Sequence, residues 1–462
     1  MGGTPVTPKT PNTSKTSRRE FLKTTLGAGA ALAAPAIVPA RVLGGRQRGP
    51  APSDRVIFGA IGTGSRSFSD TGALMRLGDV AFAAVADVDL ARARRDAAAD
   101  RLGVAESSVY QDYRRLLDRR DIDAVVIASP DHWHALHAIH AAEAGKDVYV
   151  EKAMTLTVRE GRAMVNAVRR HGRVLQVGSQ QRSDARFHRA CMLVRNGYIG
   201  TVTKVVGVNF AGAWESRLPA EPIPATLDWD MWMGPVDPKP FNENIRTSRS
   251  RPGWLSIKDF CGGEICGWGA HDLDQVQWAL GMDESGPVDV WVEGQPFAPW
   301  IAVDASRVGR FFGPQETVIH MTYPGNIALE LSEMAVPNGG ALFIGDKGQV
   351  RIDRDRFEVS QPEWLTMPLD TMPVQLYTAS NHYRNFVDCI KTRAKPVADV
   401  EIGHRSATVC HLGNIARWVS QQTQTVGEKL SWDAKQEAFT NSALANSMLE
   451  RPRRRGYELP NA

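Results

Sequence analysis

The sequence predicts a two-domain α/β protein, with a doubly wound parallel sheet in the amino-terminal domain and a second sheet in the remainder. Three observations support this. From residue 54, short apolar runs alternate with helical stretches, which is typical of parallel strands joined by crossover helices. From residue 202, strand-like segments separated by Pro and Gly follow one another. The chain has 462 residues, a length typical of about two to three domains.

The composition is that of an ordinary folded protein. Hydrophobic residues make up 43% and charged residues 23% of the chain, close to globular averages. This excludes a disordered chain, a coiled coil and a collagen-like repeat. No uninterrupted apolar run reaches the roughly 18–20 residues of a membrane-spanning helix.

The amino-terminal segment 1–40 resembles a twin-arginine export signal. Its first 16 residues are rich in Thr, Pro, Gly and Ser, and Arg18-Arg19 is followed by Phe21, Leu22 and a soft apolar stretch of Ala and Gly. The alternative interpretation is a disordered tail with a chance arginine pair. The signal predicts a periplasmic protein. The segment 1–40 would be either cleaved near Ala40 or retained as a membrane anchor. Residues 41–53 are expected to form a linker.

The net charge of +4 comes from that segment. Without residues 1–40 the chain has 50 basic and 50 acidic residues. A balanced charge gives no global attraction to nucleic acid or anionic lipid, so we expect neither a nucleic-acid partner nor stable membrane insertion after signal removal. The arginines in 451–455 are interpreted as a solvated tail or a subunit contact.

A glycine-rich loop opens the first domain. The apolar run 55–61 is suited to a buried parallel strand and leads into the loop. Gly62 would permit a tight turn, Gly64 would let a pyrophosphate approach the backbone, and a helix starting near Ser67 would offer its amides to the phosphates. Ser67 replaces the third glycine of the usual fingerprint. The predicted dinucleotide site contains Gly62, Thr63, Gly64, Ser65 and Arg66.

A carboxylate ends the second predicted strand. Asp87 follows the apolar run 80–86 and lies 23 residues after Gly64, close to the spacing expected of an acid that holds ribose hydroxyls. It would repel a 2′-phosphate, which favours NAD over NADP, whereas Arg92 and Arg94 keep NADP open.

Other polar residues fall where later strands end, at the edge where ligands bind in such sheets. The strand 124–128 is followed by Ser129, Pro130 and His132, and the strand 147–150 by Glu151-Lys152. A lysine in this place can hydrogen-bond a substrate hydroxyl and help to move its proton. The alternative is an ordinary surface Glu-Lys pair.

From these motifs onward, the chain resembles the Gfo/Idh/MocA oxidoreductases, the group that includes glucose-fructose oxidoreductase and inositol dehydrogenase, and in particular exported bacterial members. The resemblance runs in order from about residue 54 to the carboxyl terminus. The matching segments are Ala60 to Gly64, Ser129 to His134, Glu151 to Thr157, Gln180 to Arg182, Gly262 to Asp274 and Asn381 to Phe386.

The resemblance implies a Rossmann domain over 54–175 and an α+β domain over 176–462 whose open, mostly antiparallel sheet forms an oligomer interface and one wall of a substrate cleft. It implies a dimer or tetramer, NAD as cofactor and a small carbohydrate as substrate. Lys152 and His271 take the catalytic positions. Gln180 joins the expected cofactor site, and the expected substrate site contains Arg182, Trp254, Trp268 and Asp274.

Two positions depart from the family pattern. Gly267 stands where an acid is usual, four residues before His271, which puts ordinary alcohol dehydrogenation in doubt; Glu264 is the nearest candidate replacement. Ala153 stands where Pro is usual after Glu-Lys, which alters local backbone stiffness.

His271 begins a predicted helix. A helix amino terminus lowers the pKa of an imidazole, so a neutral ring could accept a proton from an alcohol. The alternative is a capping or core histidine, and Asp272 or Asp274 can cap the same helix.

The tryptophans of the Pro-rich segment 214–254 leave two interpretations open. Trp229, Trp232 and Trp254 could stack on a sugar or could form a packing cluster.

No metal site is expected. Five cysteines without paired short spacing form no evident disulfide framework, and the spacing of Cys261, Cys266 and His271 is not that of a standard zinc site.

The sequence therefore predicts an NAD(P)-dependent oxidoreductase that acts on a sugar, polyol or glycoside hydroxyl with a tightly held cofactor. One alternative is a redox-neutral glycosidase, lyase or epimerase that uses transient oxidation. A second is a noncatalytic sugar- or cofactor-binding protein of the same fold, which the glycine at position 267 motivates.

Overall fold

The computed structural model describes residues 2, 54–248, 253–303, 316–332 and 339–460. The predicted export signal and linker lie outside these residues, apart from Gly2. Residues 54–462 form one compact unit. No helix of the described residues is long and apolar enough to cross a membrane.

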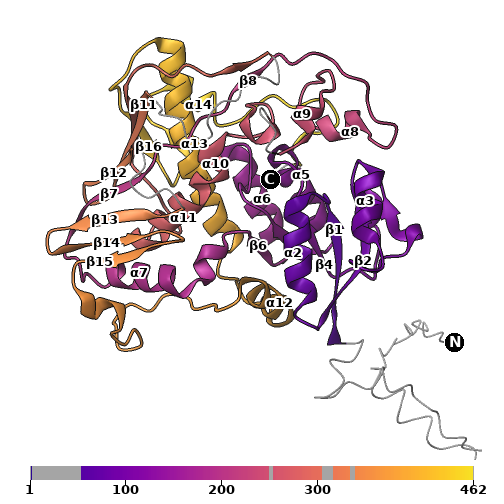
Figure 1. Cartoon of the computed structure of the whole chain (residues 1–462), viewed down its shortest axis with the longest axis horizontal. Helices are drawn as coiled ribbons and strands as arrows, with labels where there is room; N and C mark the ends of the chain where they lie inside the picture. Colours follow the sequence, from indigo (N-terminus) through magenta and orange to yellow (C-terminus); the bar gives the residue numbers. More distant parts are fainter. Residues whose placement is uncertain (1, 3–53, 249–252, 304–315, 333–338, 461–462) are drawn as a thin grey trace, which may run out of the picture. The chain divides into compact units, whose positions relative to one another are not determined.

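The first sheet is parallel throughout and has six strands. The chain enters at β1 in the middle, fills one side with β2 and β3, and then crosses to the other side (Figure 1). Ligands bind in such sheets where the strand order reverses, here between β1 and β4. In spatial order the strands are β3 (Val109–Tyr110), β2 (Val80–Ala86), β1 (Val56–Ile61), β4 (Ala124–Ile127), β5 (Asp147–Val150) and β6 (Leu175–Val177).

Helices bury both faces of this sheet, which explains why its strands are continuous apolar runs. In β4, Ala124 and Val126 point into one hydrophobic cluster, and Val125 and Ile127 point into the other. The first cluster includes residues of α2 (Ser65–Met75), α3 (Leu90–Ala97) and α12 (His382–Thr392); the second includes residues of α4 (Tyr113–Leu117), α5 (Asp131–Glu143) and α6 (Val158–Arg170).

Helix α12 comes from the far end of the sequence and lies beside α2 (Figure 1). Its Phe386 is buried with its ring centroid 6.1 Å from that of Phe58 and 5.8 Å from that of Tyr149. Arg384 and Lys391 pair with Asp79 at 2.7 and 2.6 Å. The first sheet is therefore completed by residues about 200 positions beyond its last strand.

The second sheet has nine strands and is antiparallel except where β7 pairs with β12. The predicted fold class, a doubly wound parallel sheet followed by a mostly antiparallel one, is confirmed. In spatial order the strands are β15 (Phe357–Val359), β14 (Gly348–Ile352), β13 (Ala341–Gly345), β7 (Val202–Val208), β12 (Ile327–Ser332), β11 (Thr317–Tyr323), β9 (Asp289–Gly294), β16 (Leu430–Asp433) and β17 (Ala438–Phe439).

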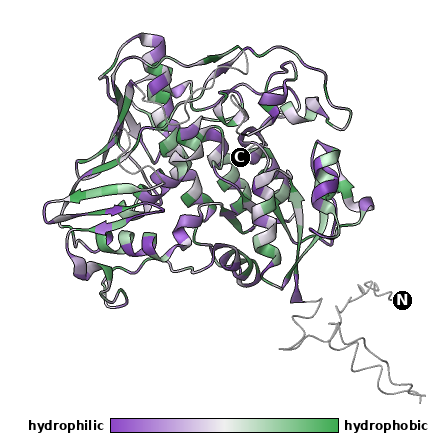
Figure 2. Cartoon of the chain, viewed as in Figure 1, coloured by the Kyte–Doolittle hydropathy of each residue, from purple (hydrophilic) through white to green (hydrophobic). Residues whose placement is uncertain are grey.

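The core of the second sheet includes residues of the long helices α7 (Ala185–Arg195), α11 (Gly269–Leu280) and α13 (Val400–Thr423). Along β11 buried residues alternate with half-buried ones, so Ile319 and Met321 pack against the helices while His320 faces the other side. Figure 2 shows strand β13 in hydrophobic colours, as expected of a strand with a covered face.

Short elements connect the sheets. Strands β8 (Glu215–Ser216) and β10 (Ile301–Ala302) form a separate two-stranded parallel sheet. The remaining elements are η3 (Glu106–Ser108), η4 (Gln180–Ser183), α8 (Trp229–Met233), α9 (Glu243–Arg246), η5 (Trp254–Ser256), α10 (Glu264–Gly267), η6 (Pro362–Leu365) and α14 (Ala443–Asn446).

Candidate active site

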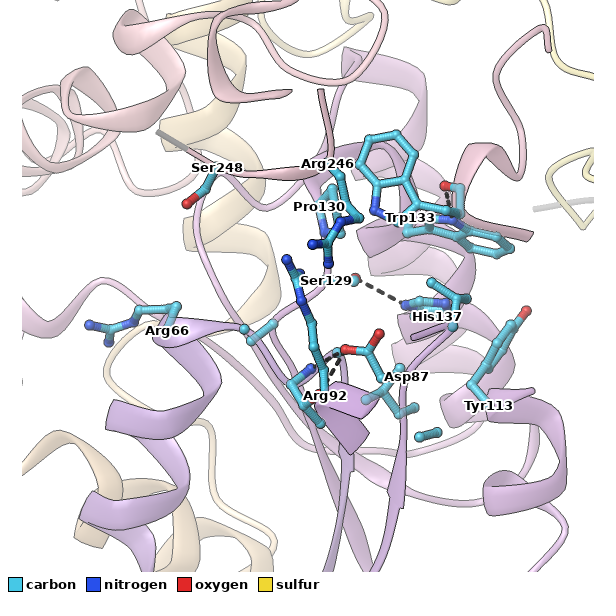
Figure 3. A pocket seen from close by; sticks show the side chains of 18 of the residues that line it. Arg66, Asp87, Arg92, Tyr113, Ser129, Pro130, Trp133, His137, Arg246 and Ser248 are labelled. Carbon is cyan, nitrogen blue, oxygen red and sulfur yellow. Dashed lines mark hydrogen bonds between the residues drawn. The ribbon is translucent and has the colours of Figure 1, made fainter. Parts of the chain in front are cut away.

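A cavity of about 300 Å³ lies at the carboxyl ends of β1, β2 and β4 (Figure 3). We call it the cofactor cleft. Of the residues predicted for a dinucleotide site, it is lined by Gly62, Thr63, Gly64, Ser65, Arg66, Asp87, Ser129 and Pro130.

The glycine loop is shaped to cradle a ligand. Gly62 has a φ of +78°, and a Cβ there would lie 2.7 Å from the backbone nitrogen of Ser129, so glycine is required. Gly64 caps α2, and a Cβ there would meet nothing within 4 Å. The space beside Gly64 and the first amides of α2 fit a pyrophosphate, because an anion at a helix amino terminus meets unpaired N–H groups.

Asp87 is held rigidly at the edge of the cleft. Its carboxylate accepts hydrogen bonds from the backbone nitrogen and hydroxyl of Thr63, at 2.7 and 2.8 Å, and from the backbone nitrogen of Asp89 at 2.9 Å. This places an acid where ribose hydroxyls would lie and fits NAD. Arg92 also lines the cleft, whereas Arg94 pairs with Glu106 at 2.8 Å outside it.

A segment distant in sequence closes the cleft from the other side. We call residues 226–248 the clasp. The backbone of the clasp bonds to the loop after β2, from Leu90 to Thr226 at 3.0 Å and from Asp228 to Val88 at 2.9 Å. Arg246 pairs with Asp89 at 3.0 Å. Sequence reasoning missed these clasp contacts, because no local pattern links the clasp to the strand end that it covers.

The tryptophans of the Pro-rich segment pack instead of lining the cavity that contains Lys152. Trp229 and Trp232 stack with ring centroids 4.6 Å apart and are buried. Trp232 and Trp254 line the cofactor cleft. The substrate contact predicted for Trp254 stays a prediction.

His132 lies outside the cofactor cleft, although we predicted it there. Its Nε2 donates to the carbonyl oxygen of Trp232 at 2.9 Å. The ring is fully buried, and burial lowers its pKa to about 4, so the imidazole is neutral at pH 7. His132 therefore fixes the clasp to α5 from behind.

A second cavity, of about 570 Å³, contains the predicted catalytic residues. We call it the Lys152 cavity. Arg66 lines both this cavity and the cofactor cleft. The lining residues are Arg66, Lys152, Gln180, Gln181, Asp184, Arg186, Phe187, Trp268, His271, Arg354 and Tyr383.

Lys152 follows β5, and its ammonium is held across the cavity wall. Its Nζ donates to the carbonyl oxygen of Gly267 at 2.9 Å. The preceding Glu151 is buried and pairs with Arg66 at 2.9 Å, and it accepts from the Nε2 of Gln180 at 3.0 Å. Glu151 therefore holds Arg66 at the junction of the two cavities, and Gln180 holds Glu151.

Asp70 completes this network and was missed by sequence reasoning. It lies one helical turn after Arg66, pairs with it at 2.7 Å, and accepts from the hydroxyl of Tyr383 at 2.7 Å. Burial, followed by the nearby Glu151, raises the pKa of Asp70 well above its usual range. The four-residue spacing from Arg66 was the available signal, but surface ion pairs share that spacing.

His271 lies in the first turn of α11 and lines the Lys152 cavity, 7% exposed. Its ring centroid is 6.1 Å from that of Trp268. The structure thus brings Lys152, His271, Gln180 and Trp268 to one cavity, and their catalytic and binding roles stay predictions.

The space beside Gly267, where the family usually has an acid, is occupied by the side chain of Glu264. A Cβ on Gly267 would lie 2.7 Å from Oε2 of Glu264, which is only 2% exposed. The carboxylate of Glu264, one turn earlier, thus occupies the place of an outward side chain at 267.

Arg182 and Asp274, both predicted for the substrate site, pair with each other. The Nε of Arg182 donates to both carboxylate oxygens of Asp274 at 2.9 Å, and its Nη2 donates to Asp283 at 2.7 Å. Both are buried and line neither cavity. This geometry gives them a structural place between α11 and η4, so their contact with substrate stays a prediction.

In the described part of the chain, all five cysteines are buried free thiols, and no group of three or more His, Cys, Asp or Glu is arranged to hold a metal ion.

Two family profiles match the chain. Residues 56–179 match the NAD-binding Rossmann fold of the Gfo/Idh/MocA oxidoreductases, and residues 189–459 match their C-terminal alpha/beta domain.

Curated relatives match over shorter stretches. The chain is 34% identical over 147 residues to the uncharacterized oxidoreductase YrbE of Bacillus subtilis, covering 32% of this chain and 42% of the relative. It is 38% identical over 124 residues to a glycosyl hydrolase family 109 protein of Shewanella baltica, covering 25% and 27%. It is 29% identical over 127 residues to inositol 2-dehydrogenase of Salmonella typhimurium, covering 27% and 38%. The chain thus spans less than half the length of these relatives.

Solved structures share the fold over most of the chain. The WlbA dehydrogenase from Bordetella pertussis, in complex with NADH and UDP-GlcNAcA, is 19% identical with a TM-score of 0.56, covering 82% of this chain and 99% of that one. The aldose-aldose oxidoreductase from Caulobacter crescentus is 19% identical with a TM-score of 0.53 and the same coverage. With both family domains matched in order, the chain belongs to the Gfo/Idh/MocA family of NAD-binding oxidoreductases.

Proposed function

We propose that the protein oxidises a hydroxyl group of a sugar, polyol or glycoside by hydride transfer to a tightly held NAD. One observation carries the proposal: Arg66 lines both the cofactor cleft and the cavity that contains Lys152 and His271. A dinucleotide in the cleft would therefore end beside one residue that can hydrogen-bond a hydroxyl, Lys152, and one that can accept its proton, His271.

Different residues of the chain would bind the cofactor, orient the substrate hydroxyl and accept its proton. NAD, when bound, supplies the hydride acceptor. The backbone of the glycine loop would hold its pyrophosphate and Asp87 its ribose hydroxyls. Lys152, fixed by its bond to the carbonyl of Gly267, would hydrogen-bond the reacting hydroxyl of the substrate. His271 would accept the proton of that hydroxyl as the hydride leaves the carbon.

The clasp supports tight retention of the cofactor. Its contacts with the β2 loop and with α5 close the cleft, so we expect slow release of NAD. Retention suits a protein exported in folded form to the periplasm, where little free nicotinamide is present for exchange. The hydride would then return to a second carbonyl compound or to a later keto intermediate. Assembly as a homodimer or homotetramer through the second sheet is part of the same proposal.

The test is to denature purified protein and quantify the released nicotinamide by chromatography. We expect close to one NAD per chain, and protein purified without nicotinamide would refute tight retention. Hydride transfer is then followed from substrate deuterated at the reacting carbon into the bound cofactor. The Lys152→Gln variant is the matched control, because it should keep its cofactor and lose the transfer.

A second candidate function is redox-neutral bond cleavage or epimerisation, in which transient oxidation acidifies the adjacent C–H bond. Gly267 favours this function, because Lys152 donates to the backbone carbonyl of this residue and not to an acidic side chain at that position. The relative in glycosyl hydrolase family 109 is in line with it. Product analysis on a panel of glycosides separates the two functions: cleavage without net reduction of nicotinamide supports the second.

A further inference from the structure

The Lys152 cavity has a positively charged lining. Four cationic side chains and a single carboxylate face it within the described residues: Arg66, Lys152, Arg186 and Arg354 against Asp184. A cavity that binds only neutral ligands has no need of such an excess, because unpaired cations in a cleft attract anions.

Two of the four cations are neutralised by neighbours. Arg66 pairs with Asp70 and Glu151 at 2.7 and 2.9 Å. Arg186 lies 3.6 Å from Asp184, the one acid of the lining. These contacts neutralise the charges of Arg66 and Arg186, so the charges of the other two cations are still to be accounted for.

Lys152 and Arg354 remain. Across the described ranges, neither forms an ion pair with a carboxylate. Lys152 is already assigned to the reacting hydroxyl. Arg354 is therefore the charge in this cavity that the proposed reaction does not use.

Arg354 is held in place by two neutral contacts. Its Nη2 donates to the Oε1 of Gln181 at 3.2 Å, and its guanidinium carbon lies 4.8 Å from the centroid of the Trp268 ring. A guanidinium supported on a flat ring keeps its remaining N–H donors aligned in its plane, the geometry that binds an oxyanion through two parallel hydrogen bonds.

Asp272 is the acid whose charge acts most strongly on Arg354. It is 2% exposed, and burial raises its pKa well above the usual range, which disfavours the charged form that would neutralise Arg354. Asp353 is the other neighbouring acid, and its Oδ1 accepts from the backbone nitrogens of Asp355 and Arg356.

We infer that the substrate is an anionic carbohydrate and that Arg354 binds its oxyanion, a carboxylate or a phosphate. Trp268 contacts both Arg354 and His271, so an anion on Arg354 would lay the sugar ring along Trp268 with a hydroxyl near His271 and Lys152. This inference rests on the proposed function, because it names the substrate class of the same site.

The experiment compares matched sugars that share one ring. D-glucuronate, D-glucose 6-phosphate and D-glucose form one set, and D-galacturonate, D-galactose 6-phosphate and D-galactose form another. Reduction of the bound nicotinamide is read at 340 nm in a single turnover, and its second-order rate constant at low sugar concentration serves as kcat/KM. Binding is measured separately by calorimetry. We expect at least one anionic member to exceed its neutral parent in kcat/KM, and the two anionic arms distinguish carboxylate from phosphate.

Arg354→Gln removes the positive charge from the lining of the Lys152 cavity. Arg356→Gln is the matched control, because it removes a positive charge from the exposed turn two residues away. We expect Arg354→Gln to lower kcat/KM for the anionic sugar about 10-fold to 100-fold, the range of a lost charge-assisted hydrogen bond, and to lower it much less for the neutral parent. Arg356→Gln should behave as wild type. Both side chains are exposed, so melting temperatures should stay equal and verify folding.

Equal kcat/KM for anionic and neutral sugars in the wild type would overturn the inference, and so would equal losses in the two variants. If no sugar reduces the nicotinamide, the proposed function fails, and calorimetry still decides the inference: binding of an anionic sugar by wild type but not by Arg354→Gln supports it, and no preference in binding refutes it.

Discussion

Replacing Gly267 by alanine tests how the wall of the Lys152 cavity is built. The carbonyl of Gly267 accepts from Lys152 at 2.9 Å. On its other side, the added Cβ would lie 2.7 Å from Oε2 of Glu264, whereas ordinary contacts begin at 3.4 Å. Leu255, at 3.6 Å, leaves normal room. The clash is therefore with one carboxylate oxygen.

The size of the effect follows from that distance. The carboxylate or the backbone of α10 must move by about 0.7 Å to restore contact. Overpacking of a buried site costs about 1–3 kcal/mol of unfolding free energy. Because misplacement by about 1 Å can cost about 100-fold in rate, we expect the hydride-transfer rate to fall about 10-fold to 100-fold as Lys152 loses its position.

The assay pairs stability with single-turnover kinetics. Urea unfolding gives the free energy of Gly267→Ala, of Glu264→Ala and of the double variant, and absorbance at 340 nm gives the rate. Because Glu264→Ala removes the clashing oxygen, alanine at 267 should cost less than about 0.5 kcal/mol in that background. A stable, fully active Gly267→Ala, or an equal cost in both backgrounds, would refute this steric explanation.

Three further predictions concern other parts of the chain. Arg453→Ala leaves the buried Glu160 without its ion-pair partner, so urea unfolding should show a loss of about 3 kcal/mol, whereas Arg455→Ala, on the exposed tail, should lose almost nothing. Asp87→Ser removes the acid at the ribose position, so the ratio of NADP to NAD in purified protein should rise about 10-fold, and an unchanged ratio would speak against its role. His132 and His411 have pKa values lowered by burial to about 4 and about 3, so the unfolded chain gains protons first as the pH falls below about 6.5. Stability should be full above that pH and drop by about 2 kcal/mol per histidine between pH 7 and pH 5, and a flat pH profile would contradict this.

The parts of the fold that local patterns encode could be predicted from the sequence. Buried parallel strands are short apolar runs, and the residues directly after them meet at one sheet edge. Asp87, Ser129 and Lys152 could be located in this way, since each follows such a run. The glycine loop could be identified because Gly62 serves a backbone conformation that few other residues adopt.

Contacts between distant segments could not be predicted. Tyr383 and Arg354 reach the Lys152 cavity from far along the chain, and no local pattern points to it. His132 lies only two residues beyond Pro130, but rotation along α5 turns its side chain away from the cleft and towards the carbonyl of Trp232. Arg182 could not be recognised as paired, because Asp283, one of its partners, lies about 100 residues away.

Helix α12 has a consequence for the biosynthesis of the protein. The rings of Phe58 and Tyr149 on the first sheet are covered by Phe386, so a nascent chain of 180 residues has all six strands and still exposes part of its core. A ribosome must translate the residues up to about 392 before that face is closed. The glycine loop and the strand ends of the cofactor cleft are thus made early and stabilised late, and chains that terminate between these points expose an apolar sheet face to chaperones and proteases.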